Sequence, residues 1–115
     1  MEVQRFGDKR VLVVEDHAEM RTQLKSMLER MNLRNVEVVV NGEEAIERLK
    51  ARQFDIILCD YELGRGKDGS QVLEEARVEN LLKSSAVFVM ITAAQTVEMV
   101  MGALEYEPDG YIAKP

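Results

Sequence analysis

Cysteine is nearly absent from this sequence of 115 residues, which contains one, Cys59. A single cysteine cannot form an internal disulfide, so a disulfide-stabilised secreted miniprotein and a cysteine-based zinc domain are both excluded. Long apolar runs are missing too. None approaches the ~20 residues of a membrane span, and the N-terminal segment MEVQRFGDKR lacks the apolar centre of a signal peptide. These absences predict a cytoplasmic protein without a membrane segment.

Positive charge is also in deficit. The chain carries 15 Lys and Arg against 21 Asp and Glu, a formal net charge of −6, and its pI is near 4.9. Because phosphate backbones require clustered Lys and Arg, this balance argues against direct nucleic-acid binding. The length suits one domain. We therefore expect a single domain over residues 1–115, with residues 1–8 as an N-terminal extension.

Short apolar runs alternate with amphipathic stretches along the chain. Glu37 interrupts the second run, which favours a place near a sheet edge. The runs resemble strands buried on both faces of a sheet, and they predict β-strands over residues 11–14, 36–40, 56–59, 87–91 and 111–113.

Four amphipathic stretches between these runs predict helices. Asn41 and Glu44 have the spacing of a capping box at the start of the second helix, and Pro108 ends the fourth. Strands alternating with helices predict an α/β fold with a parallel sheet. Five strands and four helices leave one place on the sheet uncovered, so we expect a fifth helix to be absent and the chain to be a fragment of a longer protein. The apolar positions of the four helices are Met20, Leu24, Met27, Leu28 and Met31; Ala45, Ile46 and Leu49; Val72, Leu73 and Ala76; and Val97, Val100, Met101 and Leu104.

Chemically active side chains follow four of the predicted strands. In parallel α/β sheets, ligands bind beyond the carboxyl ends of the strands. Those ends deliver Glu15 and Asp16, then Asp60, Thr92 and Lys114. Carboxylates about 4 Å apart repel by roughly 4 kcal/mol per pair at an effective dielectric near 20, so such a cluster must protonate or bind a cation. Carboxylate oxygens with no histidine or cysteine nearby favour Mg²⁺. With the lysine and the hydroxyl as a clamp, Asp60 is a candidate nucleophile toward a phosphoryl group.

In these motifs the sequence resembles the response-regulator receiver domains of two-component signalling, from about residue 9 to residue 115. The resemblance rests on VLVVED, IILCDYEL, VMITA and YIAKP, in that order. It implies a flavodoxin-like, doubly wound, five-stranded parallel sheet in the order 2-1-3-4-5 with helices on both faces. It also implies a phosphoacceptor switch, not an enzyme, that is phosphorylated by the phosphohistidine of a sensor histidine kinase or phosphotransfer protein.

The resemblance implies a role for each acidic residue. Asp60 accepts the phosphoryl group. Asp16, Asp60 and the backbone carbonyl of Glu62 ligate Mg²⁺ directly, while Glu15 acts mainly through metal-bound water. The family usually has proline where this chain has Gly64, and its Asp-Gly pair usually lies one residue closer to the nucleophile than it does here. The resemblance therefore implies an intact metal site beside an unusually long and loose loop.

The remaining roles concern the switch. Lys114 pairs with Asp60 and then with the phosphoryl oxygens, Thr92 moves to hydrogen-bond the phosphoryl group, and Tyr111 swings inward behind it. The peptide before Pro115 would be cis. The expected readout surface is the fourth helix and fifth strand, with an effector domain beyond Pro115. A missing fifth helix would expose an apolar groove that favours dimers.

Two other functions fit parts of the pattern. A haloacid-dehalogenase-type, Mg²⁺-dependent aspartyl phosphatase also uses a strand-end Asp, a Thr and a Lys, and residues 60–62 loosely resemble its D-x-D motif. Against it, the second acid is Glu62, the acidic pair comes first in the chain, and no cap insertion exists. A structural adaptor with a vestigial site would show no effect of Mg²⁺ near Tyr61.

Three tempting features have simpler interpretations. Gly64, Gly66 and Gly69 spell the G-x-G-x-x-G of dinucleotide sites, yet neighbouring carboxylates would repel a pyrophosphate. His17 could be a catalytic base, but a solvent-exposed helix start is the preferred interpretation. Cys59 lies on a buried strand and is interpreted as an inert core residue.

Overall fold

The structure is a computed structural model of the chain, and it describes residues 8–93 and 105–114. Those ranges hold all five predicted strands and three of the helices. The predicted fourth helix and Pro115, with the peptide bond before it, lie outside the described residues. In chain order the elements are β1 (Arg10–Val14), α1 (Ala18–Arg30), β2 (Asn35–Val39), α2 (Gly42–Ala51), β3 (Ile56–Asp60), α3 (Gly69–Val78), β4 (Val87–Ala93) and β5 (Gly110–Lys114).

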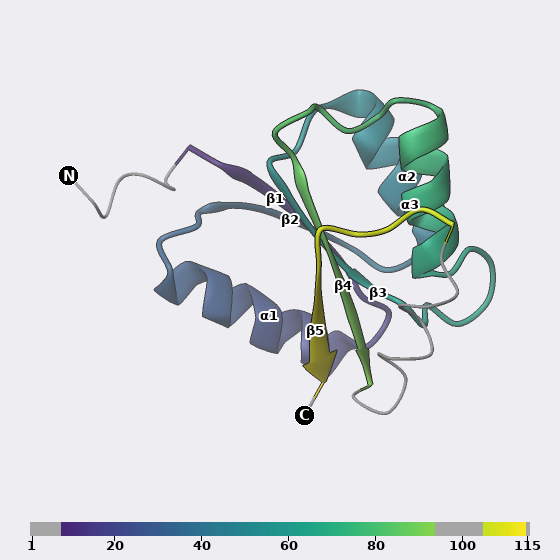
Figure 1. Cartoon of the computed structure of the whole chain (residues 1–115). Coiled ribbons are helices and arrows are strands. Elements are labelled where there is room, and N and C mark those ends of the chain that lie inside the picture. Colours follow the sequence, from purple (N-terminus) through teal and green to yellow (C-terminus); the bar gives the residue numbers. More distant parts are fainter. Residues whose placement is uncertain (1–7, 94–104, 115) are drawn as a thin grey trace.

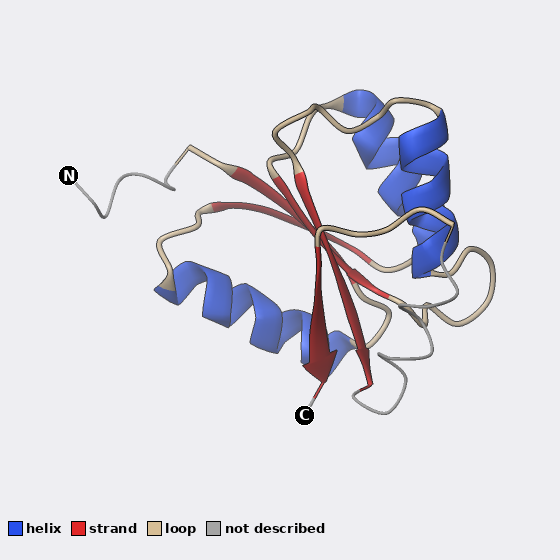
Figure 2. Cartoon of the chain, viewed as in Figure 1, coloured by secondary structure: helices blue, strands red, loops and turns tan. Residues whose placement is uncertain are grey.

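The strands form one sheet in the order β2-β1-β3-β4-β5, and every neighbouring pair is parallel. Helices α2 and α3 cover one face and α1 lies on the other (Figures 1 and 2). This confirms the doubly wound α/β fold and its strand order. Glu37 does lie on an edge strand, β2, where its carboxylate pairs with Arg52 at 3.0 Å. Among the described helices, none combines the length and apolar character that a bilayer span needs.

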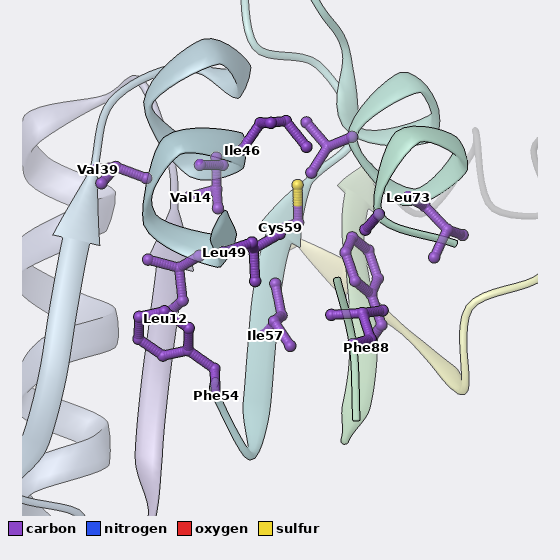
Figure 3. Packing of buried hydrophobic residues seen from close by; sticks show 14 of the residues in the cluster. Leu12, Val14, Val39, Ile46, Leu49, Phe54, Ile57, Cys59, Leu73 and Phe88 are labelled. Atoms are coloured by element: carbon purple, nitrogen blue, oxygen red, sulfur yellow. The ribbon is translucent and has the colours of Figure 1, made fainter. Parts of the chain in front are cut away.

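The larger core lies between the sheet and helices α2 and α3 (Figure 3). Leu12, Ile57 and Phe88 project from three neighbouring strands and are fully buried. Each such side chain contributes roughly 1.5–3 kcal/mol relative to an exposed one. Cys59 lies in the same layer, and burial raises the pKa of its thiol well above the usual value. The thiol therefore stays protonated, in agreement with the interpretation of an inert core residue.

A smaller core lies beneath α1, and here one expectation was wrong. Met31 is one of the apolar positions expected to fill the core beneath the first helix, but it is 54% exposed. The helix ends at Arg30, and Asn32 takes a positive φ of 64° that turns the chain back. Leu33 then donates its N–H to the carbonyl of Leu28 and is buried in place of Met31.

The same face of the sheet is partly exposed at β5 in the described part of the chain. Ile112 of β5 pairs in register with Ile91, which belongs to the smaller core, yet 45% of Ile112 is exposed. Of the described helices, α1 alone lies on this face. Among the described residues, no helix covers this end of the face at β5.

Hydrogen bonds at the N-termini of α2 and α3 fix the loops that surround the site. The Oδ1 of Asn41 accepts the N–H of Glu44, as predicted, but the Glu44 carboxylate accepts the N–H of Val40 and so completes only part of the expected capping box. A full capping box occurs at α3 between Asp68 and Gln71. It fixes the end of the loop that follows Asp60.

Candidate functional site

The predicted strand-end residues meet at the carboxyl edge of the sheet. Val14 pairs in register with Cys59, so the next residues, Glu15 and Asp60, lie side by side. Asp60 is the last residue of β3 and pairs with Ile91, which places Thr92 one position beyond it on β4. Glu15, Asp60 and Thr92 are each no more than 1% exposed. Parallel strand register, which brings equivalent ends together, produces this cluster.

Lys114 closes the cluster from the far side of β4. Its Nζ lies 2.8 Å from Oδ2 of Asp60 and 3.3 Å from Oε1 of Glu15. Strand β5 is separated from β3 by β4, so the lysine side chain crosses one strand to reach these carboxylates. One ammonium group thus faces two buried carboxylates, and negative charge remains in excess.

The pKa values of the buried pair move in opposite directions. Burial raises the pKa of Asp60 to about 6, with the nearby Glu15 charge adding to the rise and Lys114 opposing it. Burial also acts to raise the pKa of Glu15, but hydrogen bonds from His17 and the charge of Lys114 outweigh it and hold that pKa below its usual value. Asp60 is therefore the carboxylate that a further cation would stabilise most.

Several oxygens in the cluster lack hydrogen-bond partners. Thr92 Oγ1 is buried and has none among the described residues. Glu15 Oε1 and Asp16 Oδ1 lie within ion-pair distance of Lys114 and His17, but neither accepts a hydrogen bond of suitable geometry. A buried polar group left unpaired costs about 1–3 kcal/mol. These oxygens fit a site that receives a polar or cationic ligand.

His17 belongs to the cluster, which the sequence interpretation missed. Its ring is 72% exposed at the N-cap of α1, as expected, but Nδ1 lies 3.2 Å from Glu15 Oε2 and 3.1 Å from Asp16 Oδ1. The expectation that no histidine lies near the carboxylates was therefore wrong. Its position directly after the acidic pair was the available signal. Within the described residues, Glu15, Asp16, His17 and Asp60 each offer one ligand atom within 4.8 Å of the others.

The loop after β3 lies against the same cluster. Glu62 donates its N–H to Asp60 Oδ1 at 3.2 Å. Gly64 has a φ of +72°, and a Cβ there would lie 3.4 Å from Asp16 Oδ2. On its outer side the loop is anchored to α2, because Lys67 donates its N–H to Glu43 Oε2 at 3.2 Å. The long loop therefore contacts the acidic cluster on one side and α2 on the other.

Tyr111, the predicted switch residue, lies on β5. It pairs in register with Met90 on β4 and packs half-buried against the larger core. Burial raises the pKa of its hydroxyl, so the group stays protonated at neutral pH.

Comparison with known proteins identifies the family. The family model of the response regulator receiver domain matches residues 11–115, and the chain belongs to this family. The chemotaxis protein CheY-3 of Vibrio cholerae is 31% identical over 106 residues, which are 92% of this chain and 80% of that protein. The chemotaxis protein CheY of Pseudomonas aeruginosa is 27% identical over 106 residues, 92% of this chain and 84% of that protein.

Solved structures agree with this assignment. The receiver domain of a sensor histidine kinase from Pseudomonas aeruginosa PAO1, with a magnesium ion coordinated in its active site cleft, has a TM-score of 0.78 and 26% identity, over 93% of this chain and 85% of that chain. The response regulator protein TrrA from Thermotoga maritima, in complex with Mg²⁺ and BeF, has a TM-score of 0.73 and 27% identity. The match covers 93% of this chain and 87% of that chain. The chain is thus a receiver domain of two-component signal transduction, a class of signalling switches rather than classical enzymes.

Proposed function

We propose that residues 1–115 form a receiver switch in which Asp60 accepts a phosphoryl group from a phosphohistidine in the presence of Mg²⁺. The donor is a sensor histidine kinase or a phosphotransfer protein. The contact between Lys114 Nζ and Asp60 Oδ2, 2.8 Å in a buried acidic edge, supports the proposal most directly. It pairs the only strand-end lysine of the cluster with the carboxylate whose pKa is raised to about 6.

The residues present fit a magnesium ion. Asp16, Asp60 and the backbone carbonyl of Glu62 would hold it, and Glu15 would act through water. The buried oxygens of Glu15 and Asp16 without hydrogen-bond partners match the preference of Mg²⁺ for oxygen ligands. When bound, the ion neutralises negative charge on the carboxylates and on phosphoryl oxygens.

The side chains can then support phosphoryl transfer. A carboxylate oxygen of Asp60 forms a bond to phosphorus while the P–N bond of the phosphohistidine breaks. The imidazole nitrogen keeps the electron pair of that bond and takes up a proton. Lys114 is placed to follow the negative charge from Asp60 onto the phosphoryl oxygens, and the unpartnered hydroxyl of Thr92 is placed to donate to one of them.

Phosphorylation would then bias two states of the domain. A ligand shifts a conformational equilibrium only through different affinity for the two states, and the acyl phosphate would supply that difference through Thr92. Tyr111 would move inward behind Thr92, so that β5 and the residues between β4 and β5 form the readout surface. An effector domain beyond Pro115 would read it, without direct nucleic-acid contact by this domain.

Turnover distinguishes this switch from an aspartyl phosphatase. The domain is incubated with acetyl phosphate and Mg²⁺, and separately with p-nitrophenyl phosphate. We expect about one phosphoryl group per chain and no sustained hydrolysis of the monoester. Multiple turnover of the monoester would instead favour the phosphatase. If Mg²⁺ leaves the fluorescence of Tyr61 and the other tyrosines unchanged and no label forms, the site is vestigial and the proposal is wrong.

A further inference from the structure

Positive charge gathers at the amino-terminal edge of the sheet, in an otherwise acidic chain. Two adjoining hollows of about 400 and 470 Å³ lie along this edge and share the residues Asp8 and Arg10. Five positively charged residues line them, namely Lys9, Arg10, Arg34, Arg52 and Lys83. Three carboxylates lie among these, those of Asp8, Glu37 and Asp55. We call these eight residues the basic edge, because their balance is opposite to the formal net charge of −6 of the whole chain.

Parallel strands assemble the basic edge in the same way as they assemble the phosphorylation site at their other ends. Arg10 begins β1 and pairs in register with Asn35, the first residue of β2. Asp55 directly precedes β3, and Lys83, in the connection from α3 to β4, pairs with it. Asp60 is the last residue of β3. A molecule bound at the basic edge would therefore leave the acidic cluster around Asp60 accessible.

Two of the three carboxylates are already neutralised within the domain. Glu37 lies between two arginines, with Arg52 at 3.0 Å and Arg48 at 3.6 Å. The Asp55 carboxylate pairs with Lys83 and also accepts a backbone N–H. Because these contacts occupy the carboxylates, they do little to cancel the charge of the other basic side chains at this edge.

Arg10 and Arg34 supply the charge that is left. Both residues are exposed, and neither guanidinium group forms an ion pair with another residue that the structure describes. Both line the first hollow, so their charges face the same space. A guanidinium group is a planar fork of N–H donors that matches the two oxygens of a carboxylate. The edge therefore offers two unoccupied carboxylate receptors beside each other.

We propose that the basic edge docks an acidic segment of a partner protein, an extended stretch that carries several Asp or Glu side chains. Neighbouring strands lie about 4.8 Å apart, so the distance from β2 to β4 is roughly 14 Å, and an extended segment of about five residues crosses it. Such a segment also brings backbone N–H donors, which the carboxylate of Asp8 can accept. A nucleic acid suits this edge less, because phosphate oxygens only accept hydrogen bonds and its length would continue over the acidic remainder of the domain.

An NMR titration with hexaglutamate tests the proposal. The whole ¹⁵N-labelled chain is titrated with this peptide and with hexaglutamine, and we expect only hexaglutamate to shift the amide resonances of residues 8–10, 34–37, 52–55 and 83. Binding should weaken between about 20 and 200 mM salt. The double variant Arg10→Gln/Arg34→Gln should raise the Kd about fivefold or more, since two ion pairs are lost. The control Lys25→Gln removes a charge from an exposed position of α1 and should change the Kd less than about twofold.

Four outcomes would overturn the inference. The first is that hexaglutamate does not bind at low salt, and the second is that the double variant binds it as tightly as wild type does. The third is that a six-nucleotide oligothymidylate binds the same residues as tightly as hexaglutamate, which would show that the edge does not select a peptide. Sedimentation velocity gives the fourth: if wild type alone self-associates at low salt and the double variant does not, the occupant is a second copy of this chain.

Discussion

Gly69, the first residue of α3, packs directly on the backbone of Asp60. A Cβ at Gly69 would lie 2.4 Å from the Asp60 carbonyl oxygen and 2.8 Å from Cα of Tyr61. Backbone atoms cannot yield as a flexible side chain would, so Gly69→Ala should shift α3 away from β3. We predict a loss of about 1–3 kcal/mol in the free energy of unfolding, measured by urea denaturation.

Gly110→Ala is the matched control. Gly110 begins β5, and a Cβ there would meet nothing within 4 Å. Its stability should stay within about 0.5 kcal/mol of wild type. Equal losses for the two alanine variants would show that the close approach at Gly69 is not what makes glycine necessary.

The loop at Gly64 should not accept the proline that the family usually has there. Gly64 has a φ of +72°, whereas the proline ring holds φ near −65°. Gly64→Pro should therefore rearrange the loop beside Asp16, weaken Mg²⁺ binding, and cost about 1–3 kcal/mol of stability. Gly64→Ala should cost about 1–2 kcal/mol, because its Cβ has room and only the backbone conformation is unfavourable. A proline variant with wild-type stability and Mg²⁺ affinity would contradict this account of the loop.

Burial of the Asp60 charge should make the metal-free domain less stable at neutral pH. Its pKa is raised to about 6 in the folded chain, so the folded state binds more protons than the unfolded state between about pH 4 and 6. The contribution of Asp60 to stability is therefore highest below about pH 4, and it falls as the pH rises through 6. We predict that Asp60→Asn, in EDTA, gains about 1–3 kcal/mol at pH 7.5 and loses this pH dependence. A variant less stable than wild type at pH 7.5 would oppose the prediction.

Asp55, the residue directly before β3, should show the reverse behaviour. Its carboxylate pairs with Lys83 and accepts the N–H of Arg10, and these contacts lower its pKa. The stabilisation is present above the unfolded-state pKa near 3.9 and disappears as the pH falls through the lowered value. Asp55→Asn should cost about 1 kcal/mol at pH 7 and flatten the acid limb of the stability curve. Unfolding curves between pH 2 and 7 measure this, and an unchanged acid limb would count against the ion pair.

Hydrophobic pattern was sufficient to predict the sheet. Continuous apolar runs located every strand to within one or two residues, and Glu37 placed β2 at an edge, because a charge is tolerated there. The strand ends then indicated which side chains meet. Parallel register carries that information, so Lys114 could be expected beside Asp60 although 54 residues separate them.

Contacts that depend on local geometry could not be predicted in this way. The direction of the His17 ring follows from how the chain turns into α1, and no hydrophobic period encodes it. The exposure of Met31 depends on the positive φ of the following Asn32, which helical spacing cannot show. The attachment of the long loop to Glu43 joins residues 24 apart through one backbone N–H, a contact without a sequence signature.

Intact-mass spectrometry after incubation with acetyl phosphate tests the central claim most directly. Wild type, Asp60→Asn and Asp55→Asn are compared with Mg²⁺ and with EDTA. Both variants replace aspartate by asparagine, one at the last residue of β3 and one at the residue directly before that strand. The account predicts the mass of one phosphoryl group on wild type and on Asp55→Asn, only with Mg²⁺, and none on Asp60→Asn. An unlabelled wild type, or equal labelling of Asp60→Asn, would contradict it.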